Sequence, residues 1–525
     1  MDKITSVTSD FSTTGHVGPA DMAAIAAAGF RSIICNRPDD EEAGQPSATV
    51  IADAAASAGL GFAYLPVATR DIEPRDARAM REAIDRLPGP ILAFCRTGAR
   101  SQAMHAAVMK EGGPLRSYDV VIVGGGSAGI ACAASLLKRR PGLSLAIVEP
   151  AETHYYQPGW TLVGAGVFTP EATRRPMADV MPAAADWLHQ GATTFHPDDD
   201  QVVLTDGTRI GYCALVVAAG IKLDWDAIPG LREALGQNGV TSNYRFDLAP
   251  YTRDLVRTLA RGTALFTQPP MPIKCAGAPQ KAMYLSCHAW ERDGRLRDID
   301  VEFHTAGAVL FGVADYVPAL MRYIERYAID LQLGSTLVEV DGPGRRAMFR
   351  RNAGQRSENY TRTFDMLHVV PPQVAPDFVA ASPLADQSGF VDVFPATLQH
   401  RTWHNVFALG DVAATSNAKT AAAARKQAPV VAVNLLAMLD GKAPQAAYDG
   451  YGSCPLTVER GKIVLAEFGY GGKLLPSFPS WLLDGRRPTR RAWLLKDRIL
   501  PPIYWHGMLK GREWLARPER LEQPQ

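Results

Sequence analysis

YDVVIVGGGSAGIACAASLL, residues 118–137, decides the fold of this chain. The four apolar residues before the glycines predict a buried strand, and the alanine-rich segment after them predicts a helix. Between the two lies Gly124-x-Gly126-x-x-Gly129. These glycines allow a tight turn, a close approach of the backbone to a pyrophosphate, and close packing of helix on strand. Because the helix N-terminus also offers free N–H groups to phosphates, we expect a dinucleotide-binding unit here.

A second strand and an acidic residue complete this unit. Residues 143–148 are apolar and run into Glu149, twenty positions beyond Gly129. A carboxylate at that place hydrogen-bonds the ribose hydroxyls of the adenosine half. The alternative, an ordinary glycine turn, explains neither the strand nor the acid.

Composition sets the broad class. The chain has 525 residues, 47% of them hydrophobic and 21% charged, with a net charge of +1. These values indicate a globular protein of two or more domains and give no reason to expect a nucleic-acid partner. We see no signal peptide and no apolar run long enough to span a bilayer. In that setting the seven cysteines are expected to be reduced or catalytic; they are Cys35, Cys95, Cys132, Cys213, Cys275, Cys287 and Cys454.

The dinucleotide motif begins so late that an independent domain is expected before it. Helix-like stretches at residues 18–28, 47–58 and 75–87 alternate with strand-like stretches at 32–35, 61–65 and 91–94. This alternation predicts a small α/β domain with a parallel sheet over residues 1–112, followed by a linker at 113–117.

The last of these strands runs into Cys95-Arg-Thr-Gly-Ala-Arg100-Ser. A cysteine between a buried strand and a helix lies among backbone N–H groups, and Arg96 and Arg100 add positive charge. Both effects lower a thiol pKa and bind an anion. The alternative is a buried strand-end cysteine with two surface arginines.

The Cys95 loop resembles both cysteine phosphatases and rhodaneses. Four residues separate Cys95 from Arg100, whereas the phosphatase signature has five, so the resemblance favours rhodanese and a sulfane-sulfur acceptor. The whole segment resembles the small phosphatase-like domain found beside persulfide-handling enzymes. The candidates for a general acid in this domain are Asp39, Asp40 and Asp71, and the sequence does not rank them.

Three later segments indicate FAD. Residues 212–220 form a buried strand that ends in small residues, and residues 405–411 form a strand that ends in Gly410-Asp411. Asp411 is suitably placed to form a hydrogen bond with a ribityl hydroxyl of FAD. The helix predicted over 416–436 and Lys419 can stabilise negative charge on a reduced isoalloxazine. The cofactor-binding residues we expect are Gly124, Gly126, Ser127, Ala128, Gly129, Glu149, Gln157, Ala219, Gly220, Gly410, Asp411 and Lys419.

A second dinucleotide fold is expected in between, but without its nucleotide. The strand at 263–267 is followed by three prolines, at positions 269, 270 and 272, instead of a glycine motif. The partner strand at 300–304 is present, so we expect the fold to persist and NAD(P)H not to be the reductant. Cys275 stands at the start of the next predicted helix, where the dipole favours a thiolate.

Five motifs resemble sulfide:quinone oxidoreductase of the mitochondrial type. They are HYYQPGWTLVGAG (154–166), KCAGAPQKAMYL (274–285), SPLADQSGFVDVFPATLQH (382–400), KTAAAARKQA (419–428) and YDGYGSCPLTVERGKIVLAEF (448–468). The resemblance covers residues 118 to about 510. It implies tandem dinucleotide-type domains over 118–440, FAD, and a C-terminal region over 441–525 that reaches quinone in the bilayer. It also implies that sulfide forms a persulfide on a redox cysteine, which Cys275 matches.

The same resemblance places the second redox cysteine directly after Gly410-Asp411, where this chain has Val412. It therefore implies that Cys275 lacks a disulfide partner. Cys287 is a poor substitute, and Cys454 is interpreted as structural. Either Cys275 acts alone, on a persulfide brought by a small thiol, or the substrate differs.

The C-terminal stretch is basic and aromatic. Residues 485–521 carry ten Lys/Arg and three Asp/Glu, interleaved with tryptophans, leucines and isoleucines. This pattern is typical of a membrane-surface segment, which Pro501-Pro502 should break into two pieces. The alternative is a tail whose apolar face packs on its own domain.

The predicted fold is thus α/β: a small phosphatase/rhodanese-like domain, a two-dinucleotide-domain flavoprotein and an amphipathic tail. The predicted activity is FAD-dependent oxidation of sulfide or a persulfide, with quinone as acceptor and Cys275, Cys95, Arg100 and Lys419 as catalytic residues. The predicted location is cytoplasmic, peripheral on the inner face of the membrane; the oligomeric state stays open. The alternatives are a cysteine phosphatase fused to another flavin oxidoreductase, and a non-catalytic flavin or persulfide sensor.

Overall fold

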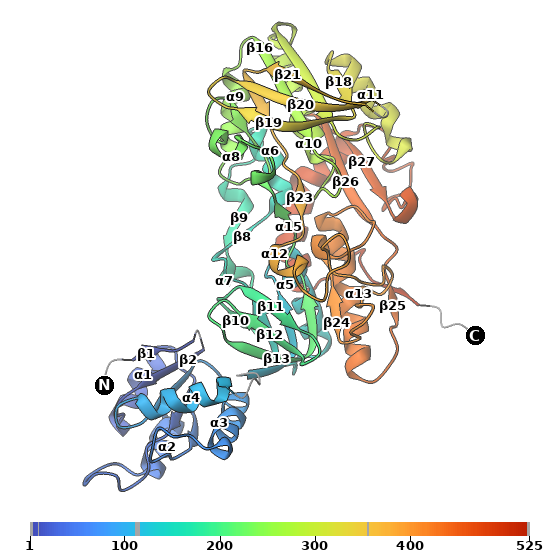
Figure 1. Ribbon diagram of the computed structural model, residues 1–525. Coiled ribbons are helices and arrows are strands. Elements are labelled where there is room, and N and C mark those ends of the chain that lie inside the picture. The colour runs from blue at the N-terminus through green and yellow to red at the C-terminus, as the bar shows by residue number, and fades with distance from the viewer. Residues whose placement is uncertain (1–3, 9, 111–115, 354–355, 522–525) are drawn as a thin grey trace. The chain divides into compact units, whose positions relative to one another are not determined.

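A computed structural model describes residues 4–8, 10–110, 116–353 and 356–521 (Figure 1). The chain divides into two compact units. One comprises residues 1–123, 143–150 and 185–215, and the other comprises residues 124–142, 151–184 and 216–525. Of the predicted linker, residues 113–115 lie outside the described residues, while residues 116 and 117 already belong to strand β6 (Arg116–Val123).

The N-terminal part of the first unit is a five-stranded sheet in the order β1-β2-β5-β3-β4. Its strands are β1 (Thr5–Ser6), β2 (Phe11–Thr14), β3 (Ser32–Cys35), β4 (Gly61–Tyr64) and β5 (Ile91–Phe94). Its helices are α1 (Met22–Ala27), α2 (Ala48–Ser57), α3 (Pro74–Arg86) and α4 (Ala99–Lys110). Ile33 and Leu92 face one core while Ile34 and Ala93 face another, as alternation along a strand requires. The predicted parallel sheet of β3, β4 and β5 is confirmed. Strand β2, which pairs in parallel with β5, and β1, which pairs antiparallel with β2, were not predicted.

The first unit also contains the strands that surround the dinucleotide motif. They run in the order β10-β7-β6-β13-β12-β11. Their bounds are β7 (Leu145–Val148), β10 (Asp186–Leu188), β11 (Ala192–His196), β12 (Gln201–Leu204) and β13 (Arg209–Val217). β6, β7 and β10 pair in parallel and are largely buried, which confirms the predicted strands on either side of the glycine motif.

In the second unit, the helix that follows the glycines packs against a second long helix. These helices are α5 (Ser127–Arg139) and α13 (Ala421–Leu439). Strand β24 (Val406–Ala408) precedes α13, and Leu409 N donates to Val217 O over 3.2 Å. Helix α13 begins five residues later than predicted, because Thr420 caps it by accepting a hydrogen bond from Ala423 N.

The second dinucleotide-type fold is present as a parallel sheet in the order β15-β22-β16-β17-β18. Its strands are β15 (Val240–Thr241), β16 (Gly262–Gln268), β17 (Ile299–Thr305), β18 (Asp330–Leu333) and β22 (Met366–His368). Helices α6 (Trp160–Gly164), α9 (Ala249–Thr258), α10 (Ala278–Arg292) and α11 (Val317–Arg326) belong to the same unit, with the meander β19 (Ser335–Asp341), β20 (Arg346–Ala353) and β21 (Arg356–Thr363). The hairpin β26 (Gly452–Glu459) and β27 (Lys462–Phe468) packs on α10 (Figure 1).

The C-terminal segment is continuous helix where a break was predicted. Helix α14 (Arg490–Leu494) passes through a π-helical turn, Leu495–Ile499, into α15 (Leu500–His506). The expected break at Pro501-Pro502 is wrong, because both prolines occupy the first turn of α15, where no N–H donor is needed. No helix among the described residues is both long and apolar enough to cross a bilayer.

The apolar side chains of this segment divide between interior and surface. Tyr504, Trp505 and Leu509 are buried against the protein itself, whereas Trp514 and Leu515 are exposed. Packing on the chain's own domain, the alternative left open by the sequence, therefore accounts for part of the amphipathic pattern.

Candidate redox and flavin site

The glycine turn leaves space for a phosphate. Gly124 has φ +109°, and a Cβ there would lie 2.5 Å from Ala218 O, so only glycine lets the turn approach the end of β13. At Gly126 and Gly220, by contrast, no described atom lies within 4 Å of an added Cβ. The N-terminus of α5 thus has free space beside Gly126.

The Gly410-Asp411 motif lies beside this turn. Gly410 has φ +75°, and a Cβ there would lie 2.9 Å from the Cβ of Ala128. Lys419 Nζ donates to the carbonyl oxygens of Asp411 (2.7 Å) and Ala413 (3.0 Å). Burial raises the pKa of Asp411 and lowers the pKa of Lys419. Three predicted positions, Ala128, Gly410 and Lys419, therefore converge with Asp411 in one place.

Gln157 joins the same neighbourhood through Lys274. Lys274 Nζ donates to Gln157 Oε1 over 2.7 Å, and burial lowers the pKa of Lys274 to about 8. Glu149 follows β7 in the other unit, where its N–H donates to Leu188 O over 3.0 Å.

Two thiols that the sequence analysis kept apart lie together. The sulfur atoms of Cys275 and Cys454 are 3.6 Å apart, and Lys281 Nζ is 3.0 Å from Cys275 Sγ. Cys454 lies on β26 and is buried. The implication that Cys275 lacks a neighbouring thiol is therefore wrong, and the neighbour is Cys454, which had been interpreted as structural. The motif that contained the missed signal is Gly452-Ser-Cys-Pro-Leu456.

Backbone geometry sets up this contact. Cys275 has φ +52°, a conformation that non-glycine residues rarely adopt. It is held there because its N–H donates to Lys419 O (2.7 Å) and its carbonyl accepts from Ala278 N (2.7 Å). A Cβ at Gly277 would lie 2.5 Å from Cys454 Sγ, so glycine at 277 is what lets β26 bring Cys454 this close.

Charge at the pair is unequal. A hydrogen bond from the Cys454 thiol, together with the ammonium of Lys281, holds the pKa of Cys275 well below its usual value. The same hydrogen bond and burial raise the pKa of Cys454. Lys496, on the π-helical turn of the C-terminal segment, acts on the same pair, and burial lowers the pKa of Lys496 to about 7. Because α10 begins only at Ala278, these side chains stabilise the thiolate in place of the expected helix start.

Positions 412 and 287, which the sequence analysis also considered, do not provide a redox partner for Cys275. Val412 is fully buried, and its carbonyl accepts from Val391 N over 3.0 Å. Cys287 is also buried, and loss of solvent raises its pKa, so its thiol stays protonated and inert.

The family follows from comparisons with known proteins. The mitochondrial sulfide:quinone oxidoreductase of Dictyostelium discoideum is 38% identical over 446 residues, which span 84% of this chain and 95% of that protein. The chain belongs to the sulfide:quinone oxidoreductase family. Residues 118–268 match the family model "Pyridine nucleotide-disulphide oxidoreductase". A sulfide:quinone oxidoreductase structure from Aquifex aeolicus, 19% identical and covering 75% of this chain and 92% of that one, has a TM-score of 0.62 and shows the same fold.

The N-terminal domain has relatives of its own. Residues 3–110 match the model "Beta-lactamase hydrolase-like protein, phosphatase-like domain". A Beta-lactamase hydrolase-like protein of Agrobacterium fabrum is 35% identical over 101 residues, 19% of this chain and 23% of that protein. The flavin oxidoreductase of the sulfide:quinone oxidoreductase family is thus preceded here by a phosphatase-like domain, as predicted.

In this member of the family, the C-terminal segment also reaches the glycine turn. Tyr504 OH lies 2.6 Å from Ser127 Oγ and 2.6 Å from His154 Nε2. Burial lowers the pKa of His154 to about 4, so its ring is neutral at physiological pH. Tyr504 is a site residue that sequence reasoning missed, because the tail was assigned to the membrane surface.

Cys95 lies in the predicted nest. Gly98 N donates to Cys95 Sγ over 3.1 Å. Burial opposes ionisation, but the backbone N–H groups of Ser101, Thr97 and Arg100 outweigh it and lower the pKa of Cys95. The loop is therefore built to hold a thiolate.

The arginines of this loop are already paired. Arg100 donates to Val67 O (2.7 Å) and forms an ion pair with Glu41 (2.7 Å), which also pairs with Arg37 (2.8 Å). Of the three general-acid candidates, Asp39 accepts a hydrogen bond from Ala48 N (2.7 Å), the first residue of α2, whose N-cap is Ser47. Glu41, which was not considered, is the carboxylate beside Arg100.

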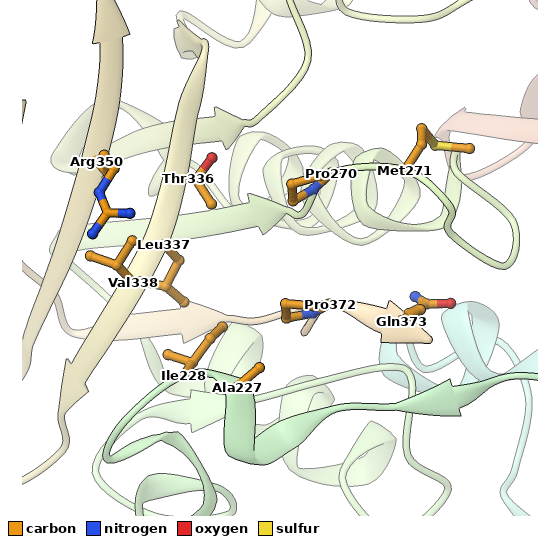
Figure 2. Close-up of a pocket in the computed structure, with 10 residues that line it drawn as sticks. All are labelled: Ala227, Ile228, Pro270, Met271, Thr336, Leu337, Val338, Arg350, Pro372 and Gln373. Carbon is orange, nitrogen blue, oxygen red and sulfur yellow. The ribbon is translucent and has the colours of Figure 1, made fainter. Parts of the chain in front are cut away.

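A pocket at the end of β16 occupies the place where the second dinucleotide fold would bind its nucleotide. The cavity has a volume of about 370 Å³. Pro270, Met271 and Pro372 lie along it and Arg350 lies at one side (Figure 2). Gln373 Oε1 accepts from Lys274 N (2.8 Å), which ties the pocket to the Cys275 segment. The prolines stand where a phosphate-binding turn would need N–H donors.

Proposed function

We propose that this chain oxidises sulfide, using FAD and passing the electrons to quinone. The observation that supports this most strongly is the Cys275–Cys454 pair, 3.6 Å apart, with Lys281 beside it. A thiol pair next to a flavin cradle is the arrangement needed to split a sulfur–sulfur bond and remove two electrons.

The cradle suits FAD. Free space at the N-terminus of α5 accommodates the diphosphate, and Glu149 and Asp411 are proposed to accept hydrogen bonds from the ribose and ribityl hydroxyls. Lys419 lies at the site as the nearby positive charge. When bound, FAD supplies the two-electron acceptor of the reaction.

The reaction begins from the Cys275–Cys454 disulfide, which requires the two sulfurs to close from 3.6 Å to about 2.05 Å. Hydrosulfide attacks Cys454 Sγ, the sulfur–sulfur bond breaks, and its electron pair stays on Cys275 as a thiolate. This direction follows from the charges: the leaving thiol with the lower pKa departs faster, and Lys281 stabilises it.

Cys454 then holds the sulfane sulfur as a persulfide. An acceptor thiolate attacks the outer sulfur, forms an acceptor persulfide and releases Cys454 as a thiolate. The two thiolates re-form the disulfide by giving up two electrons, for which bound FAD would be the acceptor that passes them on to quinone. Sulfide is thus oxidised to sulfane sulfur, and quinone takes up two electrons and two protons.

The test is anaerobic titration of the purified chain with sulfide, with flavin absorbance as the readout. We expect bleaching in the parent, and retained but unreduced flavin in Cys275→Ser and in Cys454→Ser. The exposed Cys213 provides the control, and Cys213→Ser should bleach like the parent. Bleaching of Cys454→Ser at the parent rate would refute the two-thiol reaction.

For the N-terminal domain, we propose that Cys95 accepts sulfane sulfur and does not act as a phosphatase nucleophile. Glu41 holds Arg100 and Arg37 in ion pairs at the loop. A phosphate dianion would have to displace this carboxylate to reach the guanidinium groups, whereas a single sulfur atom on Cys95 needs only the N–H nest.

Mass spectrometry of the full chain after treatment with glutathione persulfide tests this role. We expect the mass of one sulfur atom, about 32 Da, to be added at Cys95, and we expect no adduct at this position in Cys95→Ser. Hydrolysis of an aryl phosphate that is lost in Cys95→Ser, with no sulfur added at Cys95, would establish the phosphatase alternative instead.

We also propose that the chain binds the cytoplasmic face of a membrane peripherally, so that quinone is accessible. The support is a set of exposed apolar side chains near basic ones, with Trp481 (81% exposed), Leu494 and Ile499 among them. Removing the tail is an unsuitable test, because Lys496 and Tyr504 belong to the redox and flavin site. Trp481→Ser with Leu494→Ser should instead reduce sedimentation with anionic liposomes while flavin content is unchanged; equal sedimentation would place the membrane contact elsewhere.

A further inference from the structure

A basic pocket separate from the thiol pair lies among α6, α9 and α10 in the second unit. It encloses about 210 Å³, enough for about seven waters. Five arginines line it, together with the carboxylate of Asp293. These arginines are Arg253, Arg257, Arg292, Arg295 and Arg460. The reaction proposed above uses none of these side chains.

The base of the pocket has polar groups that the described chain does not satisfy. Thr161 Oγ1 and Asn243 Oδ1 are buried and have no hydrogen-bond partner among the described residues. Both side chains line the pocket and are more than nine-tenths buried. The Thr161 hydroxyl can donate a hydrogen bond, whereas Asn243 Oδ1 can only accept one, and burying either atom without a partner costs free energy. They are placed as a ligand's partners would be.

The charge around the pocket is in excess. Arg253 and Arg257 share the carboxylate of Asp254 at 3.8 and 3.7 Å, and Arg292 and Arg295 share that of Asp293 at 3.0 and 2.9 Å. These two carboxylates leave three of the five guanidinium charges without compensation from them. Guanidinium forks match phosphate oxygens in pairs, and a diphosphate brings on the order of three negative charges.

We propose that this pocket binds a compact diphosphate-bearing anion. Oxygens of one phosphate accept from Arg292 and Arg460 at the rim, and Thr161 Oγ1 donates from the base. Asn243 Oδ1 accepts from the P–OH group that a diphosphate of about three negative charges retains. A neutral ligand or a single carboxylate leaves most of the positive charge unmatched. The chemistry is shared by a free nucleoside diphosphate or pyrophosphate and by a lipid whose headgroup is a diphosphate.

Isothermal titration calorimetry of the flavin-loaded full chain tests the proposal, with pyrophosphate, ADP and adenosine as probes. We expect pyrophosphate and ADP to bind and adenosine not to. Arg292→Gln and Arg460→Gln should each raise the Kd about tenfold or more, and Thr161→Val several-fold. Arg346→Gln, a surface arginine on β20, is the matched control and should leave the Kd unchanged. The affinity should weaken with added NaCl.

Vesicle sedimentation separates the two sources. If Arg292→Gln with Arg460→Gln loses binding to vesicles that contain a polyprenyl diphosphate, and pyrophosphate competes with these vesicles, the ligand is a lipid headgroup. If sedimentation is unchanged while the calorimetric Kd rises, it is a free diphosphate. Equal pyrophosphate affinity in Arg292→Gln, Arg460→Gln and Arg346→Gln, or no binding of any polyanion, overturns the proposal. Flavin reduction by sulfide is not a readout, so this result does not depend on the proposed reaction.

Discussion

Replacing Lys281 by methionine should raise the pKa of Cys275 and slow the splitting of the disulfide. Lys281 Nζ lies 3.0 Å from Cys275 Sγ. At an effective dielectric constant of about 20, two unit charges at this separation attract by about 5 kcal/mol, or about 4 pKa units. Lys496 lies close enough to replace part of the lost charge, so we expect a net rise of about 2 to 3 units.

The rate follows from this shift. With about 0.4 to 0.5 log units of rate per pKa unit of the leaving thiol, cleavage should slow about 6- to 30-fold. The assays are stopped-flow flavin reduction by sulfide, and the pH dependence of Cys275 alkylation in the reduced enzyme, followed by mass spectrometry. Lys281→Arg, which keeps the charge, should recover most of the rate, and the exposed Lys442→Met is the control. An unchanged alkylation profile in Lys281→Met would refute the electrostatic argument.

Three further outcomes are expected. Val412→Cys should not raise the rate of flavin reduction by sulfide, because position 412 is fully buried and Cys454 already lies beside Cys275. A faster rate would show that a cysteine at position 412 can act as the second redox thiol. Since burial lowers the pKa of Lys496 to about 7, the unfolded chain binds more protons between that value and about 10.4, so its contribution to stability rises with pH across this window. The Tm advantage of Lys496→Met over the parent should therefore shrink between pH 7 and 10, and a constant difference would contradict this. Glu41→Gln should remove the carboxylate that compensates the charge of Arg100 beside Cys95, and so speed alkylation of Cys95 by about 2- to 10-fold at pH 7; an unchanged rate would show that Glu41 does not offset that charge.

The sequence predicted the fold where local patterns are strong. Strands β3, β4 and β5 of the N-terminal sheet were predicted, because short apolar runs alternate there with amphipathic helices, whereas β1 and β2 were missed. The convergence of Ala128, Gly410 and Lys419 was also predictable, since glycine motifs state a backbone requirement that is local in sequence.

What the sequence could not predict depends on contacts between distant segments. Cys275 and Cys454 are 179 positions apart, and no periodicity links a loop before α10 to a strand of the β26–β27 hairpin. The resemblance indicated position 412 for the second redox cysteine. The requirement for glycine at position 277 could have indicated Cys454, but it is visible only once Cys454 packs against Gly277. Lys496 and Tyr504 were missed because a basic aromatic tail fits a membrane surface and a protein interior equally well. Burial decides between the two, and burial is a property of the folded chain.

Lys496 and Tyr504 come later in the chain than every other residue of the redox and flavin site. During synthesis, segments that emerge first fold first. A nascent chain can therefore bring Cys275, Cys454 and Lys281 together before α14 and α15 exist, but the second ammonium and the hydroxyl that bonds Ser127 arrive only with the last helices. A thiol pair that forms early therefore gains the charge of Lys496 only after the C-terminal segment has folded onto the protein.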